Sequence, residues 1–110
     1  MNKLVNTYKT REVLHNRLIS VIGVKNAYFQ PPATLKMQYP CIIYSVLAFE
    51  SVFADNKNYL TDTAYNVIYV TKNPDNDVYY RMLNGFDKCT FVNYYIFDNL
   101  HHYKFKLYFG

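Results

Sequence analysis

Alternating hydrophobic and polar positions mark several segments of this chain as β-strands. In the last segment, Tyr103, Phe105, Leu107 and Phe109 fall on one face, with polar or basic residues and Tyr108 between them. A repeat of two residues is typical of a strand with one buried and one solvated side. The pattern predicts four long strands, over residues 41–50, 60–72, 89–97 and 102–109.

Two other segments follow a helical repeat. Leu14, Leu18 and Ile22 belong to one apolar stripe that extends backward to Leu4, and Gly23 suits the left-handed backbone at a helix end. A shorter helix is predicted after the polar residues 73–77, where Asp75 or Asn76 can cap the free amides, and it ends at residues 84–85. A short strand over residues 24–30 follows the first helix.

The order of these elements indicates an α+β fold. Short connections between successive strands favour antiparallel pairing. We therefore predict a single domain over residues 1–110, with an antiparallel sheet of four to five strands and two helices packed on one face. Residues 51–59 favour a polar turn, and the strands on either side either stop before it or continue as arms of one long hairpin.

Composition points to a folded chain rich in tyrosine. Of the 110 residues, 51% are hydrophobic and 18% are charged, so intrinsic disorder is not expected. The 13 tyrosines have an apolar ring and a polar hydroxyl, a combination that suits both half-buried strands and protein interfaces. No run of about 18 apolar residues predicts a membrane span, and the polar start does not resemble a signal peptide.

Positive charge is concentrated in the first third of the chain. Residues 1–36 carry six basic residues and one acidic residue, whereas residues 37–110 carry six basic and seven acidic ones. A basic segment can attract nucleic acid or an acidic protein surface. It forms no dense run and matches no nucleic-acid-binding module, so a solvated helix face is the favoured interpretation.

Residues with catalytic potential form no recognisable constellation. Cys41 and Cys89 lie far apart in predicted strands, and we expect free thiols, although a disulfide stays open if these strands are neighbours. Successive strand residues point to opposite faces, so His101 and His102 do not readily share a metal ion, and we expect a turn or strand-edge role for them. His15 is expected to be partly buried and hydrogen-bonded. The sequence therefore predicts no enzyme, no cofactor and no metal site.

A series of short motifs runs along the chain, at residues 28–32, 37–44, 54–56, 59, 65–67, 73–75 and 98–108. In these motifs the chain resembles the tail terminator proteins of long-tailed bacteriophages, which complete the tail and join it to the head. The similarity extends from about residue 10 to the end of the chain. Its motifs are ones that build structure rather than ones that carry out catalysis. At residues 73–75 the family tends to begin with an acidic residue, where this chain has Asn73.

The resemblance implies an α+β subunit of a hexameric ring in the virion, made in the host cytoplasm. Such a ring ends tube polymerisation at the head-proximal end of the tail. Its partners are copies of itself, the tail tube protein and the head connector or stopper protein, while DNA passes through the lumen without sequence-specific binding. Alternatives are a head-closure or connector subunit and, from a different class, a nucleic-acid-binding module. The residues expected at the subunit or tube interface are Val52, Phe53, Asp55, Asn56, Lys57 and Tyr59.

Overall fold

The described part of the chain forms two helices and five strands. The computed structural model describes the backbone of residues 3–54 and 57–109, and the side chains of residues 10–49 and 63–109. The elements, in chain order, are α1 (Lys3–Ile22), β1 (Ala27–Phe29), β2 (Cys41–Ala54), β3 (Lys57–Thr71), α2 (Val78–Gly85), β4 (Cys89–Phe97) and β5 (Leu100–Phe109).

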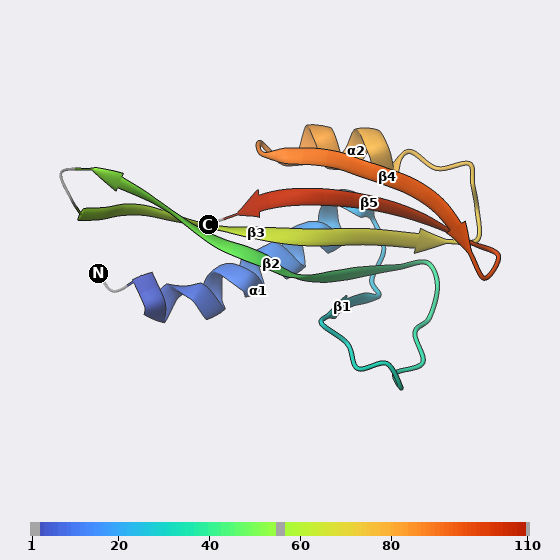
Figure 1. Cartoon of the computed structure of the whole chain (residues 1–110). Helices are drawn as coiled ribbons and strands as arrows, with labels where there is room; N and C mark the ends of the chain where they lie inside the picture. Colours follow the sequence, from blue (N-terminus) through green and yellow to red (C-terminus); the bar gives the residue numbers. More distant parts are fainter. Residues whose placement is uncertain (1–2, 55–56, 110) are drawn as a thin grey trace.

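The five strands form one mixed sheet in the order β1-β2-β3-β5-β4. All the pairings between β2, β3, β5 and β4 are antiparallel, which confirms the predicted α+β class (Figure 1). The exception is β1, whose Ala27–Phe29 runs parallel to the start of β2. The purely antiparallel sheet expected from sequence was therefore wrong at this edge, because the loop over residues 30–40 returns the chain in the direction of β1.

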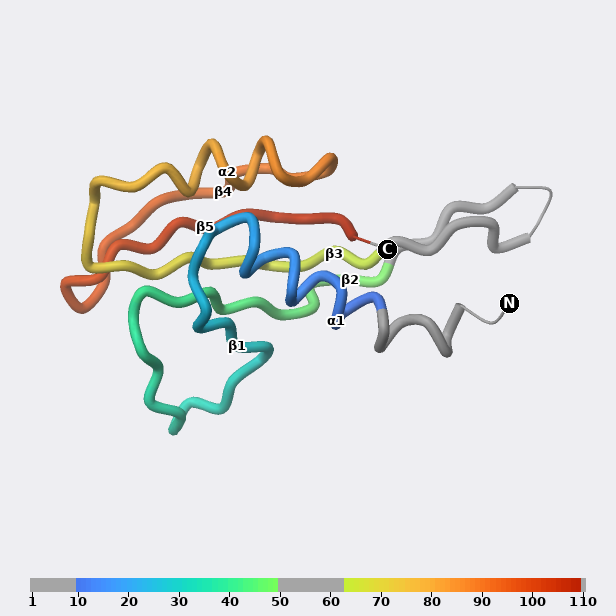
Figure 2. The backbone as a smooth tube through the Cα atoms, turned by 180° about the vertical axis from the view of Figure 1, so that it is seen from behind, coloured from blue at the N-terminus to red at the C-terminus, as the bar shows by residue number. Residues whose placement is uncertain are grey.

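Helix α1 provides one wall of the core. It ends where Gly23 adopts a φ of 84° and its amide donates to the carbonyl of Ile19 at 2.8 Å, as the sequence predicted. Figure 2, which shows the molecule from behind, has α1 crossing in front of β2 and β3.

Within the described residues, no helix is long and apolar enough to cross a membrane.

The main core joins both helices to alternate residues of the sheet. Tyr44, Val67 and Phe105 are register partners across β2, β3 and β5, and all three are buried. They belong to one cluster with Leu18 of α1 and Met82 of α2. A second, smaller cluster is formed by Cys41, Val70 and Leu100. The alternation predicted for these strands therefore reflects a real division between faces.

The hairpin of β2 and β3 is longer than the two predicted strands. Its register continues to the pair Ala54↔Lys57, so the two strands are the arms of one long hairpin. Strand β5 pairs with β3 only as far as Thr63↔Phe109, so the hairpin extends beyond the rest of the sheet. The molecule is accordingly elongated, with extents of 50 × 28 × 22 Å.

A two-residue turn connects β4 to β5. Asp98 and Asn99 have φ values of 55° and 61°, a left-handed pair typical of tight hairpin turns. The predicted connection was two residues longer, because a turn of this type lets β5 begin at Leu100 rather than at His102.

Candidate interface at the open sheet edge

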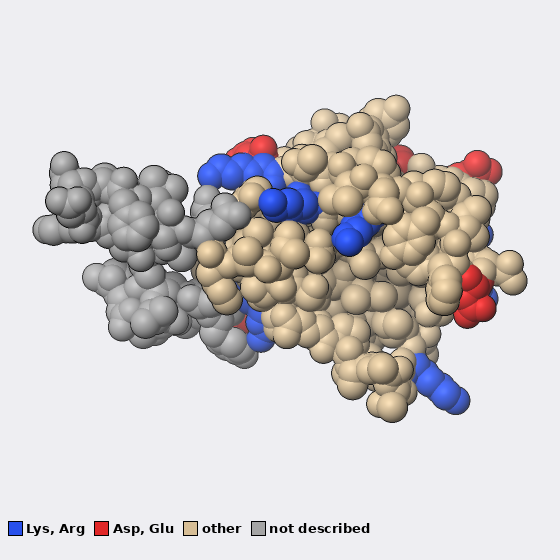
Figure 3. Space-filling view, in the orientation of Figure 1, with Lys and Arg blue, Asp and Glu red and all other residues tan. Residues whose placement is uncertain are grey.

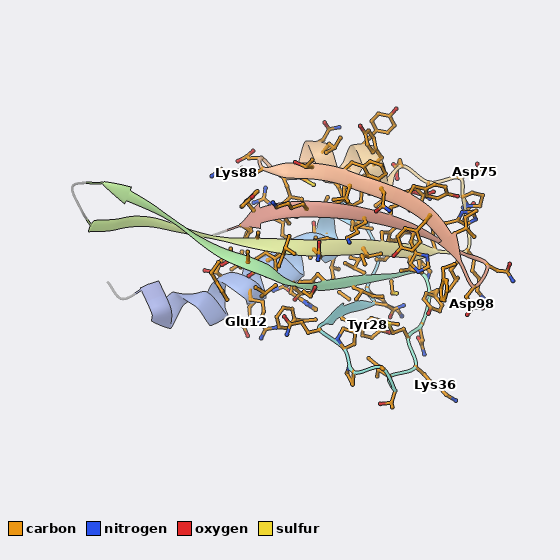
Figure 4. All side chains as sticks on the ribbon, viewed as in Figure 1. Glu12, Tyr28, Lys36, Asp75, Lys88 and Asp98 are labelled. Carbon is orange, nitrogen blue, oxygen red and sulfur yellow. The ribbon has the colours of Figure 1, made fainter. Side chains whose placement is uncertain are left out.

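Strand β4 forms one edge of the sheet and carries no charged side chain. Among the described strands it pairs with β5 alone, so its outer backbone groups face away from the sheet. Figure 4 shows Lys88 and Asp98 at its two ends, and the nine residues between them are all uncharged. Monomeric proteins usually protect such an edge with charges or proline, because open strands pair with other chains.

A β-bulge divides β4 into a covered and an uncovered half. The register with β5 shifts between Phe91 and Asn93, which leaves Val92 as the extra residue. Before the bulge, Phe91 packs on the main core and makes an edge-to-face contact with Tyr79 of α2, at 5.2 Å between ring centroids. The bulge is therefore the boundary beyond which β4 loses its cover.

Beyond the bulge, large apolar side chains are exposed on both faces of β4. Ile96 is 61% exposed and Phe97 is 70% exposed, although isoleucine and phenylalanine are usually buried in folded proteins. Val92, Tyr94 and Tyr95 are also exposed. A run of neighbouring exposed hydrophobic residues is typical of a protein interaction site, in contrast to single exposed residues. We refer to residues 92–97 as the edge patch.

Two histidine–tyrosine pairs hold the edge patch against β5. The Tyr94 hydroxyl and Nδ1 of His101 are 2.6 Å apart, and the two rings are stacked with centroids separated by 5.8 Å. The rings of Tyr95 and His102 are also stacked, with 4.7 Å between their centroids. Stacking and hydrogen bonding restrict the rotamers of these side chains, so less conformational entropy is lost when a partner covers them.

The loop before α2 is attached to the same end of the sheet. Nδ2 of Asn76 donates to the Tyr103 hydroxyl at 3.0 Å, and that hydroxyl donates to the carbonyl of Pro74 at 3.3 Å. Oδ1 of Asn76 accepts the amide of Val78, the first residue of α2. Of the two predicted caps, Asn76 therefore provides this bond, and the neighbouring Asp77 forms an ion pair with Arg81.

The structure gives the histidines structural partners. His101 and His102 lie within β5, an interior strand, rather than in the turn, and pair with Tyr94 and Tyr95 of the edge strand β4. Nδ1 of His15 is 2.7 Å from the buried hydroxyl of Tyr44. The expectation of a partly buried, hydrogen-bonded His15 is confirmed. The described residues contain no group of three or more His, Cys, Asp or Glu side chains that could hold a metal ion.

The two cysteines are free and lie apart. Cys41 belongs to the smaller cluster, whereas Cys89 packs against the main core. Burial raises the pKa of each thiol to about 11. Both groups are therefore protonated at neutral pH, and a protonated thiol is a poor nucleophile and a poor metal ligand.

Two arginines of the basic first third pack against aromatic rings. The Arg11 guanidinium lies 4.3 Å from the centroid of Phe29, and that of Arg17 lies 5.3 Å from the centroid of Phe86. Arg17 also donates to the carbonyl of Gly85 at 3.0 Å. These contacts attach α1 to β1 and to the end of α2, so both side chains have a structural role.

No protein family model, curated protein or solved structure matches this chain. The edge patch and the pattern of charges around it are therefore the structural observations from which a function is inferred, together with the resemblance of the sequence.

The interface residues expected from sequence lie outside the described side chains. Val52, Phe53, Lys57 and Tyr59 are in the hairpin strands, where only the backbone is described, and Asp55 and Asn56 are outside the described residues altogether. Their role stays a prediction. The edge patch was not selected from the sequence, although the uncharged run in residues 89–97 was a readable signal for it.

Proposed function

We propose that this chain is a structural virion protein that forms a ring at the head-proximal end of a bacteriophage tail tube. In this role the ring ends tube polymerisation and provides the surface that joins the head. The proposal combines the resemblance of the sequence to tail terminators with one structural observation. That observation is the open edge of β4, which is uncharged and carries exposed Tyr94, Tyr95, Ile96 and Phe97.

An exposed edge of this composition favours self-association. Backbone groups on the outer side of β4 offer hydrogen bonds along the strand, and the edge patch adds apolar area to be buried. A ring of identical subunits needs two different surfaces that fit one another and a rotation that closes. The strand order supports such an arrangement, because it places two different edges of the sheet on opposite sides of one subunit.

Other features of the structure favour assembly over catalysis. Both thiols have raised pKa values, and the histidines are engaged with tyrosines or with backbone. Figure 3 shows that most of the surface seen from the front is neither basic nor acidic. A neutral surface of this kind is better suited to protein contacts than to a charged substrate or to the nucleic-acid backbone.

The test is the mass and shape of the purified protein, alone and mixed with the tail tube protein of the same phage. We expect rings in negative-stain images, and a multiple of the subunit mass by light scattering, at least in the mixture. An Ile96→Asp variant places a charge in the edge patch and is expected to remain monomeric. Val13→Asp is the matched control, since Val13 is exposed on α1 away from β4. A native protein that stays monomeric in both samples contradicts the proposal.

Disruption of the gene in its phage separates the terminator from the alternatives. Overlong tubes without heads are expected if the chain ends tube growth. Tails of normal length beside DNA-leaking heads identify a head-closure subunit instead. Filter binding of DNA at low salt that weakens steeply as salt is added identifies a nucleic-acid-binding module.

A further inference from the structure

Strand β2 has a second open edge, on the side of the sheet opposite to β4. The short β1 covers β2 only at Ile42, Ile43 and Tyr44. Two residues beyond Tyr44, Oε1 of Gln30 accepts the amide of Val46 at 3.1 Å, which extends this cover slightly. In the described pairings, the outer side of β2 has no strand beside it after that point.

The uncovered stretch of β2 resembles the edge patch in chemistry. Leu47 is 48% exposed and Phe49 is 67% exposed, and residues 45–49 contain no charged side chain. Leu47 is also the extra residue of a β-bulge between Val46 and Ala48. The sheet therefore has two uncharged, apolar open edges, and each begins next to a bulge.

We propose that β4 of one copy pairs with the open stretch of β2 of the next copy, so that the sheet continues from subunit to subunit. The inference rests on the proposed ring, because it names the two surfaces through which copies of this chain meet. Pairing of one β4 with another β4 would leave the apolar stretch of β2 uncovered in both subunits. Pairing of β4 with β2 covers both edges of every subunit in a closed ring.

Strand direction is compatible with this pairing. The three successive pairs β2–β3, β3–β5 and β5–β4 are antiparallel, so β4 runs opposite to β2 within one subunit. A neighbouring copy in the same orientation therefore presents its β2 antiparallel to β4. The alternation of directions continues across the junction without interruption.

The register predicts a tilt that suits a closed ring. Tyr95 is level with Cys41 through His102 and Val70, whereas the open stretch of β2 begins at Leu47, beyond the cover of β1 and Gln30. Pairing Tyr95 with Phe49 of the next copy keeps Phe97 clear of that cover and offsets the subunits by eight residues, or about 26 Å along the strands. Four strands span about 19 Å across the sheet, so the offset corresponds to a tilt of roughly 54°. The strands of closed sheets are also strongly tilted.

Disulfide cross-linking tests the pairing directly. The double variant Phe49→Cys with Tyr95→Cys places one thiol on each edge. Within one subunit these positions are separated by three strand spacings, about 14 Å, in addition to the offset along the strands, which is too far for a disulfide. After oxidation of the assembled particle we expect covalent trimers and larger multimers on a non-reducing gel. A variant that pairs Phe49→Cys with Ile96→Cys samples the adjacent register.

The controls identify each outcome. The native chain, with Cys41 and Cys89 free, and each single variant are expected to give no multimer beyond a dimer. The combination of Val13→Cys with Tyr95→Cys places a thiol on α1 and is expected to behave like the single variants. Efficient dimers from Tyr95→Cys alone would indicate that β4 pairs with β4, and would overturn the inference. Rings that form without cross-links overturn the edge pairing but leave the proposed function standing, whereas monomers in every sample contradict both.

Discussion

The main core and the edge patch contain the same kinds of side chain in opposite environments. Tyr44 is almost fully buried under α1, and its hydroxyl meets His15. Tyr94 follows the same strand alternation and also meets a histidine, yet it lies on an exposed edge. The difference arises from what covers each strand rather than from its residues. A tyrosine-rich strand therefore builds a core where a helix crosses it, and offers a binding surface where none does.

The largest expected contrast between the two regions is the cost of removing an apolar side chain. Leu18→Ala deletes a fully buried side chain of α1 and is expected to lower the free energy of unfolding by about 3 kcal/mol. Leu47→Ala removes the same atoms from an exposed position and is expected to cost less than about 0.5 kcal/mol. Urea denaturation of both variants measures the contrast. Equal losses would contradict the assigned burial.

Alkaline pH is expected to lower the stability of the fold, because the unfolded chain ionises the thiol of Cys41 more readily than the folded core does. Its pKa is about 11 in the folded protein, above the ordinary value of 9.0, so the stabilisation is complete below pH 9 and is lost as the pH rises to 11. Two pKa units correspond to at most about 3 kcal/mol. Burial also raises the pKa values of Tyr44, Tyr65 and Tyr69, which adds to the loss above pH 10.

The variant Cys41→Ala isolates the contribution of the thiol. Its unfolding free energy at pH 7 differs from that of the native chain because a buried group has changed. The decrease between pH 8 and pH 11 is expected to be smaller than in the native chain. A decrease of the same size in both proteins would show that Cys41 ionises as readily in the folded chain as in the unfolded one.

The turn that connects β4 to β5 is expected to control the stability of the edge itself. Asn99 has a φ of 61°, which an alanine side chain disfavours, so Asn99→Ala is expected to cost about 1–2 kcal/mol. Asn99→Gly accepts this backbone and is expected to change stability by only a few tenths of a kcal/mol. Asn93→Ala, in an exposed strand position, is the matched control. Equal effects of alanine and glycine at residue 99 would contradict the left-handed turn.

Much of the fold was predictable from periodicity because strands and helices bury alternate residues differently. The bounds of β4 were predicted as observed, and the end of α1 was read from Gly23. The parallel pairing of β1 was not predictable, since three residues carry too little pattern to specify a direction. The extension of the hairpin was also left open, because residues 51–59 combine turn-forming and strand-forming types.

The candidate site was harder to predict than the fold. Whether an apolar strand is central or at an edge depends on strand order, which alternation does not specify. Strand β5 inserts between β3 and β4, and this leaves Ile96 and Phe97 at the margin of the sheet. From sequence alone, a polar turn at residues 51–59 was the more obvious projection, so the interface was expected there. The absence of charged residues from β4 was the local signal. It indicates an interface only once the strand is known to lie at an edge of the sheet.

The smallest expected contrast concerns the two tyrosine hydroxyls that meet histidines. Tyr44→Phe removes the partner of Nδ1 of His15 in a partly buried place, where water does not readily replace it, and is expected to cost about 1 kcal/mol. Tyr94→Phe removes the partner of His101 at the exposed edge, where water can take its position, so the expected cost is below about 0.5 kcal/mol. Parallel urea denaturation of the monomeric protein measures both values. A cost at Tyr94 equal to that at Tyr44 would mean that the edge hydroxyl is shielded from water in the isolated subunit, and the edge patch would then not be the open surface on which the proposed ring depends.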